Sequence, residues 1–243
     1  MDCVQRPKMI LFDYGQTLVS EERFDGVRGT EALLARAVEN RYGLTAEQVQ
    51  QEAESINREL GRSDPALRNL NTVEIPNHMF SSYLYESLGI RFDLPQEEID
   101  RTFWDAASPG KPTEGAGELL FFLRTEGIRT AVLSNITYAG NVVADRIHRL
   151  FPGNAFEFIL ASSEYLFRKP NPRIFRLALE KARLRPEEVW YAGDNYAADV
   201  IGARSAGLFP VLYRGAASKR AEEREDVTTI SSWSQLRDLL AAL

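Results

Sequence analysis

The chain has 243 residues, of which 44% are hydrophobic and 26% are charged, an ordinary balance for a folded protein with a buried core. One Cys and two His exclude a disulfide framework, a thiolate zinc cluster and an iron–sulfur centre. The net charge of −6 argues against nucleic acid as the main partner. No apolar run has the length of a signal peptide or approaches the ~20 residues of a membrane span, so we expect no membrane association and a cytoplasmic location. Carboxylates are the most numerous reactive groups, and we expect them to carry any chemistry.

The first half of the chain is expected to be mainly helical. A short apolar run at 8–12 predicts a first strand, and the segment 20–112 then follows a helical period. Helices are predicted over 28–42, from a capping box at Thr45 and Gln48 to Gly61, over 77–88, and over 95–107. No strand is expected between these helices. With 17 acidic and 10 basic residues, the segment carries the whole excess of negative charge, and we expect it to form a small helical bundle.

In the rest of the chain, short apolar runs alternate with helical segments. Strands are predicted at 129–134, 156–161, 188–192, 209–213 and 227–230. Helices are predicted at 114–126, 138–150, 172–183, 196–206 and 234–242. Such alternation is typical of βαβ units that form a parallel sheet covered by helices on both faces. We therefore predict an α/β fold with a Rossmann-like parallel sheet, in which a core domain of 1–19 and 113–243 carries an inserted α-helical cap domain of 20–112.

Polar residues follow the predicted strands of the core. In chain order they are Asp13, Ser134, Asn135, Lys169, Asp194 and Asp199. Because the carboxyl ends of parallel strands meet at one edge of the sheet, we expect them to share a crevice. Asp13 is a possible nucleophile or metal ligand, and Asp194 and Asp199 are oxygen ligands suited to Mg²⁺. Lys169 offers a compact cation and Ser134 a hydroxyl donor, so together these groups are the parts of a phosphoryl-transfer site.

Four motifs in this order resemble those of the haloacid dehalogenase superfamily, most of whose members are phosphatases. The first motif of the family, Asp-x-Asp-Gly-Thr, stands here as Asp13-Tyr14-Gly15-Gln16-Thr17. Its Ser or Thr after a strand is matched by Ser134, and its Lys, often followed by Pro, by Lys169-Pro170. Its Gly-Asp with a later Asp is matched by Gly193-Asp194 and Asp199. The resemblance spans essentially the whole chain and puts 20–112 in the place of the family's helical cap.

The resemblance implies a role for each of these residues. Asp13 would attack phosphorus and form an aspartyl-phosphate, Asp194 would bind Mg²⁺ beside it, and Asp199 would hold a metal-bound water or orient Lys169. Phosphate binding is expected of Ser134, Lys169, Asn135 and Tyr14, and metal binding of Asp13, the main-chain carbonyl of Gly15, Asp194 and Asp199. The substrate would be a small phosphorylated molecule selected by the cap. A carboxylate or second phosphate of that substrate could be bound by one of four arginines of the segment: Arg23, Arg28, Arg62 or Arg68. The choice between a monomer and a homodimer stays open.

The sequence departs from the family's pattern at Gly15, which occupies the place of the second aspartate. In the family's phosphatases that residue protonates the leaving oxygen and later activates water, a contribution of about 10²–10⁴-fold. Metal binding should survive, because Gly15 keeps its carbonyl, while proton transfer is impaired. The rate should then depend steeply on the pKa of the leaving group. A flat dependence would show a substitute acid, for which Tyr14, His78 or a carboxylate of the cap are candidates.

Other functions remain open at this point. The protein could hydrolyse acyl phosphates or anhydrides, whose leaving groups need little protonation, or be a non-catalytic or weakly active binding or regulatory protein with a surviving Mg²⁺ site. A dehalogenase releases halide without a proton, but the family's dehalogenases resemble Asp-x-Tyr-Gly-Thr and need no Mg²⁺. Phosphonate cleavage uses a Schiff-base lysine of the cap, and Lys111, at the exit of the segment, is its one lysine.

Overall fold

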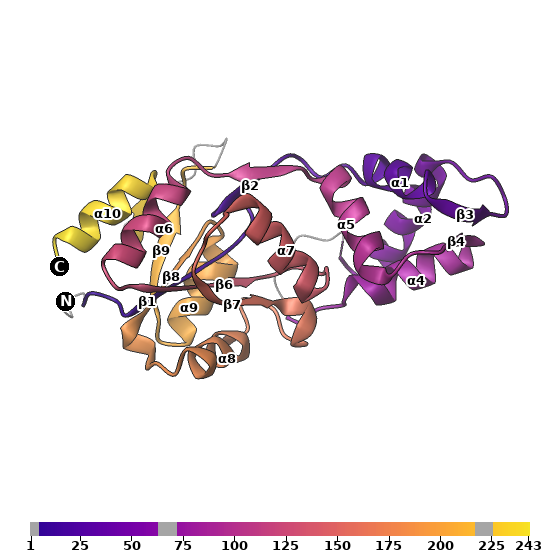
Figure 1. Cartoon of the computed structure of the whole chain (residues 1–243). Helices are drawn as coiled ribbons and strands as arrows, with labels where there is room; N and C mark the ends of the chain where they lie inside the picture. Colours follow the sequence, from indigo (N-terminus) through magenta and orange to yellow (C-terminus); the bar gives the residue numbers. More distant parts are fainter. Residues whose placement is uncertain (1–4, 63–71, 217–225) are drawn as a thin grey trace.

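The computed structural model describes residues 5–62, 72–216 and 226–243. At its centre is a six-stranded sheet in the order β10-β9-β8-β1-β6-β7, in which every neighbouring pair is parallel (Figure 1). Its strands are β1 (Met9–Phe12), β6 (Arg129–Ser134), β7 (Phe156–Ala161), β8 (Val189–Gly193), β9 (Phe209–Tyr213) and β10 (Thr228–Ile230). The predicted α/β fold with a parallel sheet is confirmed.

Helices cover both faces of the sheet because its strands are apolar on both sides. Successive residues of a strand point to opposite faces. In β1, Ile10 and Phe12 are buried in one cluster with α6, α7 and α10, whereas Met9 and Leu11 are buried in another with α8 and α9. These helices are α6 (Ala116–Thr125), α7 (Gly140–Leu150), α8 (Pro172–Ala182), α9 (Gly202–Ser205) and α10 (Trp233–Ala241). The carboxyl ends of the strands are left as the edge at which a ligand site can form.

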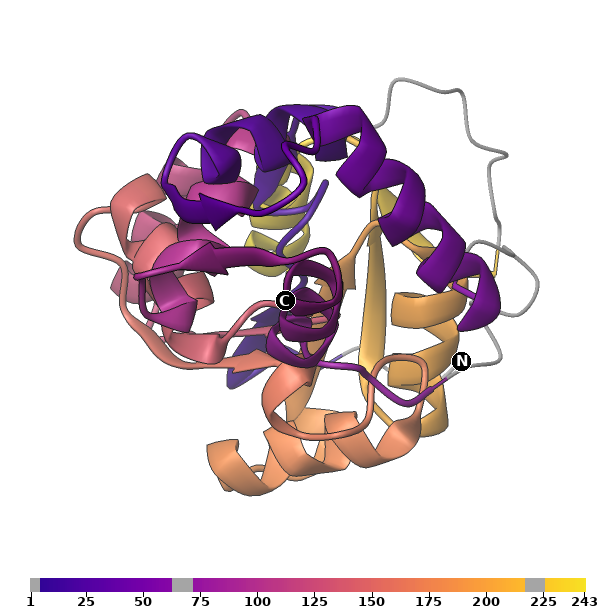
Figure 2. The same cartoon turned by 90° about the vertical axis from the view of Figure 1, so that its right-hand side faces the viewer.

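The segment between β1 and α6 forms a separate layer of helices. The elements of this helical layer are α1 (Gly26–Leu34), β3 (Ala37–Asn40), α2 (Ala46–Glu59), α4 (Asn77–Ser87), β4 (Ile90–Phe92) and α5 (Gln96–Ala107). They surround an apolar cluster of their own that includes Leu33, Val49 and Leu84. Two short strands, β2 (Val19–Glu21) and β5 (Gly110–Pro112), pair antiparallel where the chain enters and leaves the layer. Figure 1 shows these helices at one end of the molecule, and Figure 2 looks onto that end with the helices in front of the sheet.

The helix predicted over 28–42 is wrong in its second half, where the structure has a strand. The helix expected over 28–42 ends at Leu34, and the chain then forms β3, which pairs antiparallel with β4. A helix over 28–42 would have placed Val38 and Tyr42 on the same face as Leu33, but both side chains are exposed. The expectation of a bundle without strands is wrong for the same reason, because pairing with a distant strand outweighs a local helical period.

The other predicted elements agree with the structure to within a few residues. The capping box of Thr45 and Gln48 begins α2, and the side chain of Asn171 caps α8 with Pro172 directly after it. The helix predicted at 196–206 begins with wider, π-helical turns over Tyr196–Ile201 and continues as α9. Among the described residues, no helix combines the length and the apolar character that crossing a membrane needs.

A short main-chain bridge joins the helical layer to the core a second time. The main-chain N–H of Arg168 donates to the carbonyl of Thr72, at an N–O distance of 2.9 Å. The N–H of Glu74 donates to the carbonyl of Leu166 at 2.7 Å. Because Lys169 follows directly, the bridge lies beside the predicted site.

Candidate active site

A crevice of about 920 Å³ opens at the carboxyl ends of β1, β6 and β8. All eight site residues expected from the sequence line it: Asp13, Tyr14, Gly15, Ser134, Asn135, Lys169, Asp194 and Asp199. The other side of the crevice is lined by residues of the helical layer and of the segment that leads into it: Phe24, Glu54 and Asn57. The site residues converge because parallel strands end at the same edge of the sheet.

Three carboxylates form the acidic part of the crevice. One oxygen from each of Asp13, Asp194 and Asp199 lies within 4.8 Å of the others. Burial, followed by the charges of Asp13 and Asp199, raises the pKa of Asp194 to about 7. A Cβ on Gly193 would lie 2.3 Å from Asp199 Oδ2, so the glycine is what lets this carboxylate approach the end of β8. Closely spaced carboxylate oxygens of like charge are the ligand set that Mg²⁺ favours.

Lys169 joins two of these carboxylates. Its Nζ donates to Asp199 Oδ1 at 2.6 Å and lies 2.9 Å from Asp13 Oδ1, and its side chain is 2% exposed. Nζ also contacts the hydroxyl of Tyr191 at 2.6 Å. Burial by itself would lower the pKa of Lys169, but the charges of Asp13 and Asp199 outweigh it and raise that pKa above the ordinary value. The lysine is therefore held as a cation beside the candidate nucleophile.

Ser134 and Asn135 have different functions in this arrangement. Ser134 Oγ donates to Asp13 Oδ1 at 2.6 Å, so it contacts the same oxygen as Lys169. The side-chain amide of Asn135 instead holds the main chain of Lys169: Nδ2 donates to the lysine carbonyl at 2.9 Å, and Oδ1 accepts from the lysine N–H at 2.7 Å. With both ends of its amide engaged, Asn135 positions the lysine, and a contact with phosphate would fall to its main chain.

The side chain of Tyr14 belongs to the apolar core rather than to a phosphate position. It is 1% exposed, its hydroxyl accepts from Arg146 Nε at 2.8 Å, and its ring packs against Trp104 at 5.5 Å between centroids. A phosphate contact from Tyr14 would therefore come from its main chain. His78, a candidate for the substitute acid, is exposed on α4 and is not among the residues that line the crevice.

Glu21 lines the crevice and was not singled out by the sequence. It lies at the end of β2, and its Oε1 accepts from Trp104 Nε1 at 3.1 Å and lies 3.5 Å from Arg146 Nη2. Burial, only partly offset by Arg146, raises the pKa of this carboxyl above its ordinary value. The one signal in the sequence was general, that a carboxylate of the 20–112 segment could replace the missing acid. The pairing of β2 with β5 brings Glu21 to the site, and that pairing has no local signature.

An ionic cluster lines the crevice beside the bridge between core and helical layer. Glu74 is buried, accepts from Ser162 Oγ at 2.7 Å, and lies 3.4 Å from Arg168 Nη1 and 3.7 Å from Arg62 Nη2. Both arginines line the crevice. Of the four arginines considered from the sequence, Arg62 is therefore at the site, whereas Arg68 lies outside the described residues.

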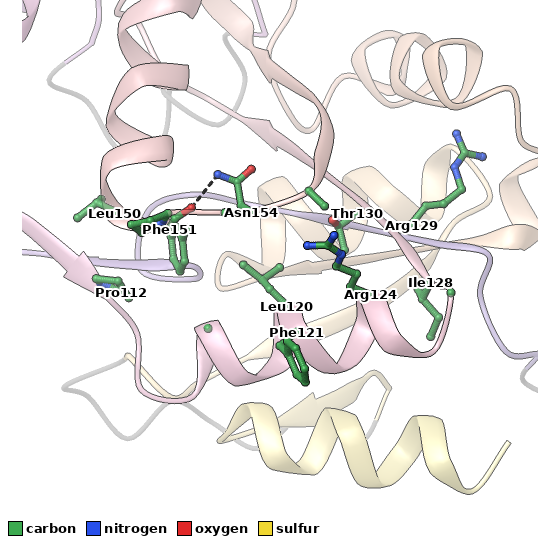
Figure 3. A pocket seen from close by; sticks show the side chains of 15 residues that line it. Pro112, Leu120, Phe121, Arg124, Ile128, Arg129, Thr130, Leu150, Phe151 and Asn154 are labelled. Carbon is green, nitrogen blue, oxygen red and sulfur yellow. Dashed lines mark hydrogen bonds between the residues drawn. The ribbon is translucent and has the colours of Figure 1, made fainter.

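A second cavity, of about 510 Å³, lies near the start of β6 and has a different character (Figure 3). Leu120 and Phe121 of α6 and Phe151 after α7 give it an apolar lining, with Arg124 and Arg129 at its side. Its lining contains no carboxylate, His or Cys. The catalytic candidates of the described chain are therefore gathered in the crevice at the other ends of the strands.

The chain is similar in sequence to a family of hydrolases and to several curated relatives. The model of the haloacid dehalogenase-like hydrolase family matches residues 7–207. Haloacid dehalogenase-like hydrolase domain-containing protein 3 of Mus musculus is 32% identical over 146 residues, which cover 59% of this chain and 57% of that protein. The glyceraldehyde 3-phosphate phosphatase of Pyrococcus furiosus is 26% identical over 228 residues, covering 87% of this chain and 82% of the relative. The chain thus spans little more than half the length of the mouse relative.

Solved structures of a phosphatase and of a dehalogenase share the fold of this chain. A HAD phosphatase from Thermococcus onnurineus matches with a TM-score of 0.65 and 19% identity, covering 96% of this chain and 97% of that one. A 2-haloacid dehalogenase from Pseudomonas syringae pv. Tomato matches with a TM-score of 0.63 and 18% identity, covering 97% and 99%. Because a phosphatase and a dehalogenase match about equally well, the fold alone does not choose between the two chemistries.

Proposed function

Because the chain belongs to the haloacid dehalogenase-like hydrolases, we propose that it is a Mg²⁺-dependent phosphatase that works through an aspartyl-phosphate on Asp13. The observation that carries the proposal is one shared contact: Asp13 Oδ1 meets both Ser134 Oγ, at 2.6 Å, and Lys169 Nζ, at 2.9 Å. Catalysis of phosphoryl transfer consists mostly of positioning and charge stabilisation. Here a nucleophilic carboxylate, a hydroxyl donor and a buried cation meet at one oxygen atom, and together they can supply both the positioning and the charge stabilisation.

The donor set of the crevice fits a magnesium ion. We propose that Asp13, Asp194 and the main-chain carbonyl of Gly15 would hold it, while Asp199 would bind through a water or orient Lys169. A bound ion would offset the charge of the carboxylates and of the transferring phosphoryl group. The raised pKa of Asp194 supports this assignment, because it reflects first the burial of the carboxylate and then the negative charges of Asp13 and Asp199 beside it.

The residues of the chain would then act in sequence. Asp13 attacks phosphorus while the bond from phosphorus to the leaving oxygen breaks. Ser134 and Lys169, which contact Asp13 Oδ1, donate to the phosphoryl oxygens and stabilise their charge as it redistributes. Water then attacks the aspartyl-phosphate, which releases inorganic phosphate and restores the carboxylate of Asp13.

We propose small phosphorylated carbohydrates as the substrate class. The Pyrococcus furiosus relative is named for glyceraldehyde 3-phosphate, which supports a compact substrate. We also propose that 20–112 is a cap domain on a core of 1–19 and 113–243. Phe24, Glu54 and Asn57 would then select the part of the substrate that lies beyond the phosphate, since they line the crevice opposite the strand ends.

A phosphate-release screen over small phosphorylated carbohydrates, with and without Mg²⁺, tests the proposal. We expect release that requires Mg²⁺ and that is abolished in Asp13→Asn, because an amide is a far poorer nucleophile. Mass spectrometry of the acid-quenched protein should show one added phosphoryl group on the native chain and none on the variant. Full activity of Asp13→Asn would overturn the covalent mechanism. Tight binding of these substrates with no turnover would favour a non-catalytic protein instead.

A further inference from the structure

The space that the missing aspartate would fill is faced by another carboxylate. A Cβ built on Gly15 would lie 3.3 Å from Oε2 of Glu21. Among the described residues, chain neighbours aside, no other heavy atom lies within 4 Å of that point. The two positions therefore compete for one space: a side chain on residue 15 would enter the region that the Glu21 carboxylate now borders.

The surroundings of Glu21 fix its orientation. Its Oε1 is held by Trp104 Nε1 at 3.1 Å, which leaves Oε2 as the oxygen directed at Gly15. Its main chain is held by the pairing of β2 with β5 and by Gln16 Nε2, which donates to the Glu21 carbonyl at 3.0 Å. Gln16 does so with a φ of 54°, in the left-handed region that favours glycine. The side chain of Glu21 is 18% exposed and lines the crevice together with Asp13.

We propose that Glu21 is the general acid and base of this site, in place of the aspartate that Gly15 lacks. The inference rests on the proposed phosphatase function and deepens it. In the first half of the reaction, the bond from Asp13 to phosphorus forms, the bond to the leaving oxygen breaks, and the Glu21 carboxyl gives its proton to that oxygen. In the second half, the Glu21 carboxylate takes a proton from water, whose oxygen bonds to phosphorus as the bond to Asp13 breaks. Phosphate is released and both side chains return to their starting forms.

A purely structural role, as a partner of Arg146, does not account for this placement. Arg146 Nη1 pairs with Asp105 Oδ1 at 2.8 Å, and its other nitrogens donate to the hydroxyl of Tyr14 and the carbonyl of Ser108. Its guanidinium also lies over the ring of Trp104 at 4.2 Å. Arg146 is therefore held in place without Glu21. The distance from Arg146 to Glu21, 3.5 Å, is also longer than the 2.8 Å from Arg146 to Asp105.

The test compares Glu21→Gln with the native protein on aryl and alkyl phosphates in the presence of Mg²⁺. The native protein should show a shallow dependence of kcat/KM on the pKa of the leaving group. In Glu21→Gln that dependence should become steep, with alkyl phosphate turnover reduced by about 10²–10⁴-fold. With p-nitrophenyl phosphate, the variant should release about one equivalent of p-nitrophenolate in a burst and then turn over slowly, because its leaving group needs no proton but the water still needs a base.

Two further variants make the result specific. Glu22→Gln is the matched control, because Glu22 is exposed, pairs with Arg28 and does not line the crevice; it should behave as the native protein. Gly15→Asp should restore alkyl phosphate turnover to Glu21→Ala, since the shorter side chain leaves room for a carboxylate at position 15. An unchanged leaving-group dependence in Glu21→Gln, or a uniform loss on all substrates without a burst, would overturn the inference alone. Absence of phosphate release from the native protein would overturn the proposed function and the inference with it.

Discussion

Lys169 and Asp199 form an ion pair inside the protein: Nζ of the lysine lies 2.6 Å from Oδ1 of the aspartate, and both side chains are almost inaccessible to water. The same ammonium group lies 2.9 Å from Asp13 Oδ1, and its charge also acts on Asp194. A buried charge that loses its partner strongly destabilises a fold. The group proposed to bind the phosphoryl oxygens is therefore also what lets three carboxylates gather at one edge of the sheet.

Lys169→Met should lower the free energy of unfolding by about 3–5 kcal/mol, because methionine fills the space but leaves Asp13 and Asp199 without their cation. Urea unfolding followed by circular dichroism measures the change. Combining Lys169→Met with Asp199→Asn should lose less than the sum of the two single changes, since the orphaned carboxylate is removed with its partner. Strictly additive losses would show that Lys169 and Asp199 are not energetically coupled.

The stability of the metal-free protein should fall as pH rises from about 4 to about 7. The pKa of Asp194 is about 7 in the folded chain against an ordinary value of 3.8, so between these values the folded state binds more protons than the unfolded state. Raising the pH through this window therefore favours unfolding. Urea unfolding with EDTA at several pH values measures the slope, and Mg²⁺ should flatten it. Asp194→Asn should also flatten it, and an equal slope in that variant would contradict the assignment.

Asn135→Ala should reduce kcat/KM by up to about 10²-fold while lowering the free energy of unfolding by about 1–2 kcal/mol. The amide of Asn135 makes two hydrogen bonds to the main chain of Lys169, so its loss should misplace the ammonium group more than it weakens the fold. Phosphate release and urea unfolding together separate the two effects. Asn154→Ala is the matched control, since its amide donates to the Phe151 carbonyl at the second cavity and should leave kcat/KM unchanged.

Gly15→Asp, made alone, should not raise alkyl phosphate turnover. The new Cβ would lie 3.3 Å from Glu21 Oε2, so the added carboxylate would compete for space with an acid group already in place. A gain in kcat/KM for alkyl phosphates in this variant, together with an unchanged leaving-group dependence in Glu21→Gln, would instead show that position 15 is the sole defect and that Glu21 supplies no proton.

Much of the core and of its site could be predicted from local features of the chain. The run around Ile10 is buried on both faces, which is the property that marks a central strand of a parallel sheet. Once the strands are placed, Asp13, Ser134 and Asp194 must come together, because each follows a strand at the same edge. Fold and cluster thus follow from two local signals, apolar runs and the polar residues at their ends.

The features that could not be predicted depend on pairing between distant parts of the chain. Glu21 reaches the crevice because β2 pairs with β5, and the strand β3 replaces the end of a predicted helix because β4 lies beside it. Asn135 lines the crevice, but only the path of the loop around Lys169 shows that its amide is turned to the main chain. None of these three contacts leaves a periodic pattern in the residues that make it.

The helical layer is attached to the core through β2 and β5 and through the hydrogen bonds that Thr72 and Glu74 make to the loop before Lys169, besides other contacts such as the ion pair of Arg101 with Asp145 and the main-chain bond from Asn77 to Thr137. A hinge motion about β2 and β5 must therefore either break the two main-chain bonds of the bridge or carry that loop along with it. In the first case the amide of Glu74 exchanges with solvent each time the molecule opens. In the second, Lys169 leaves Asp13 whenever the layer swings away. Only in the second case are admission of a substrate and alignment of the ammonium group a single mechanical event.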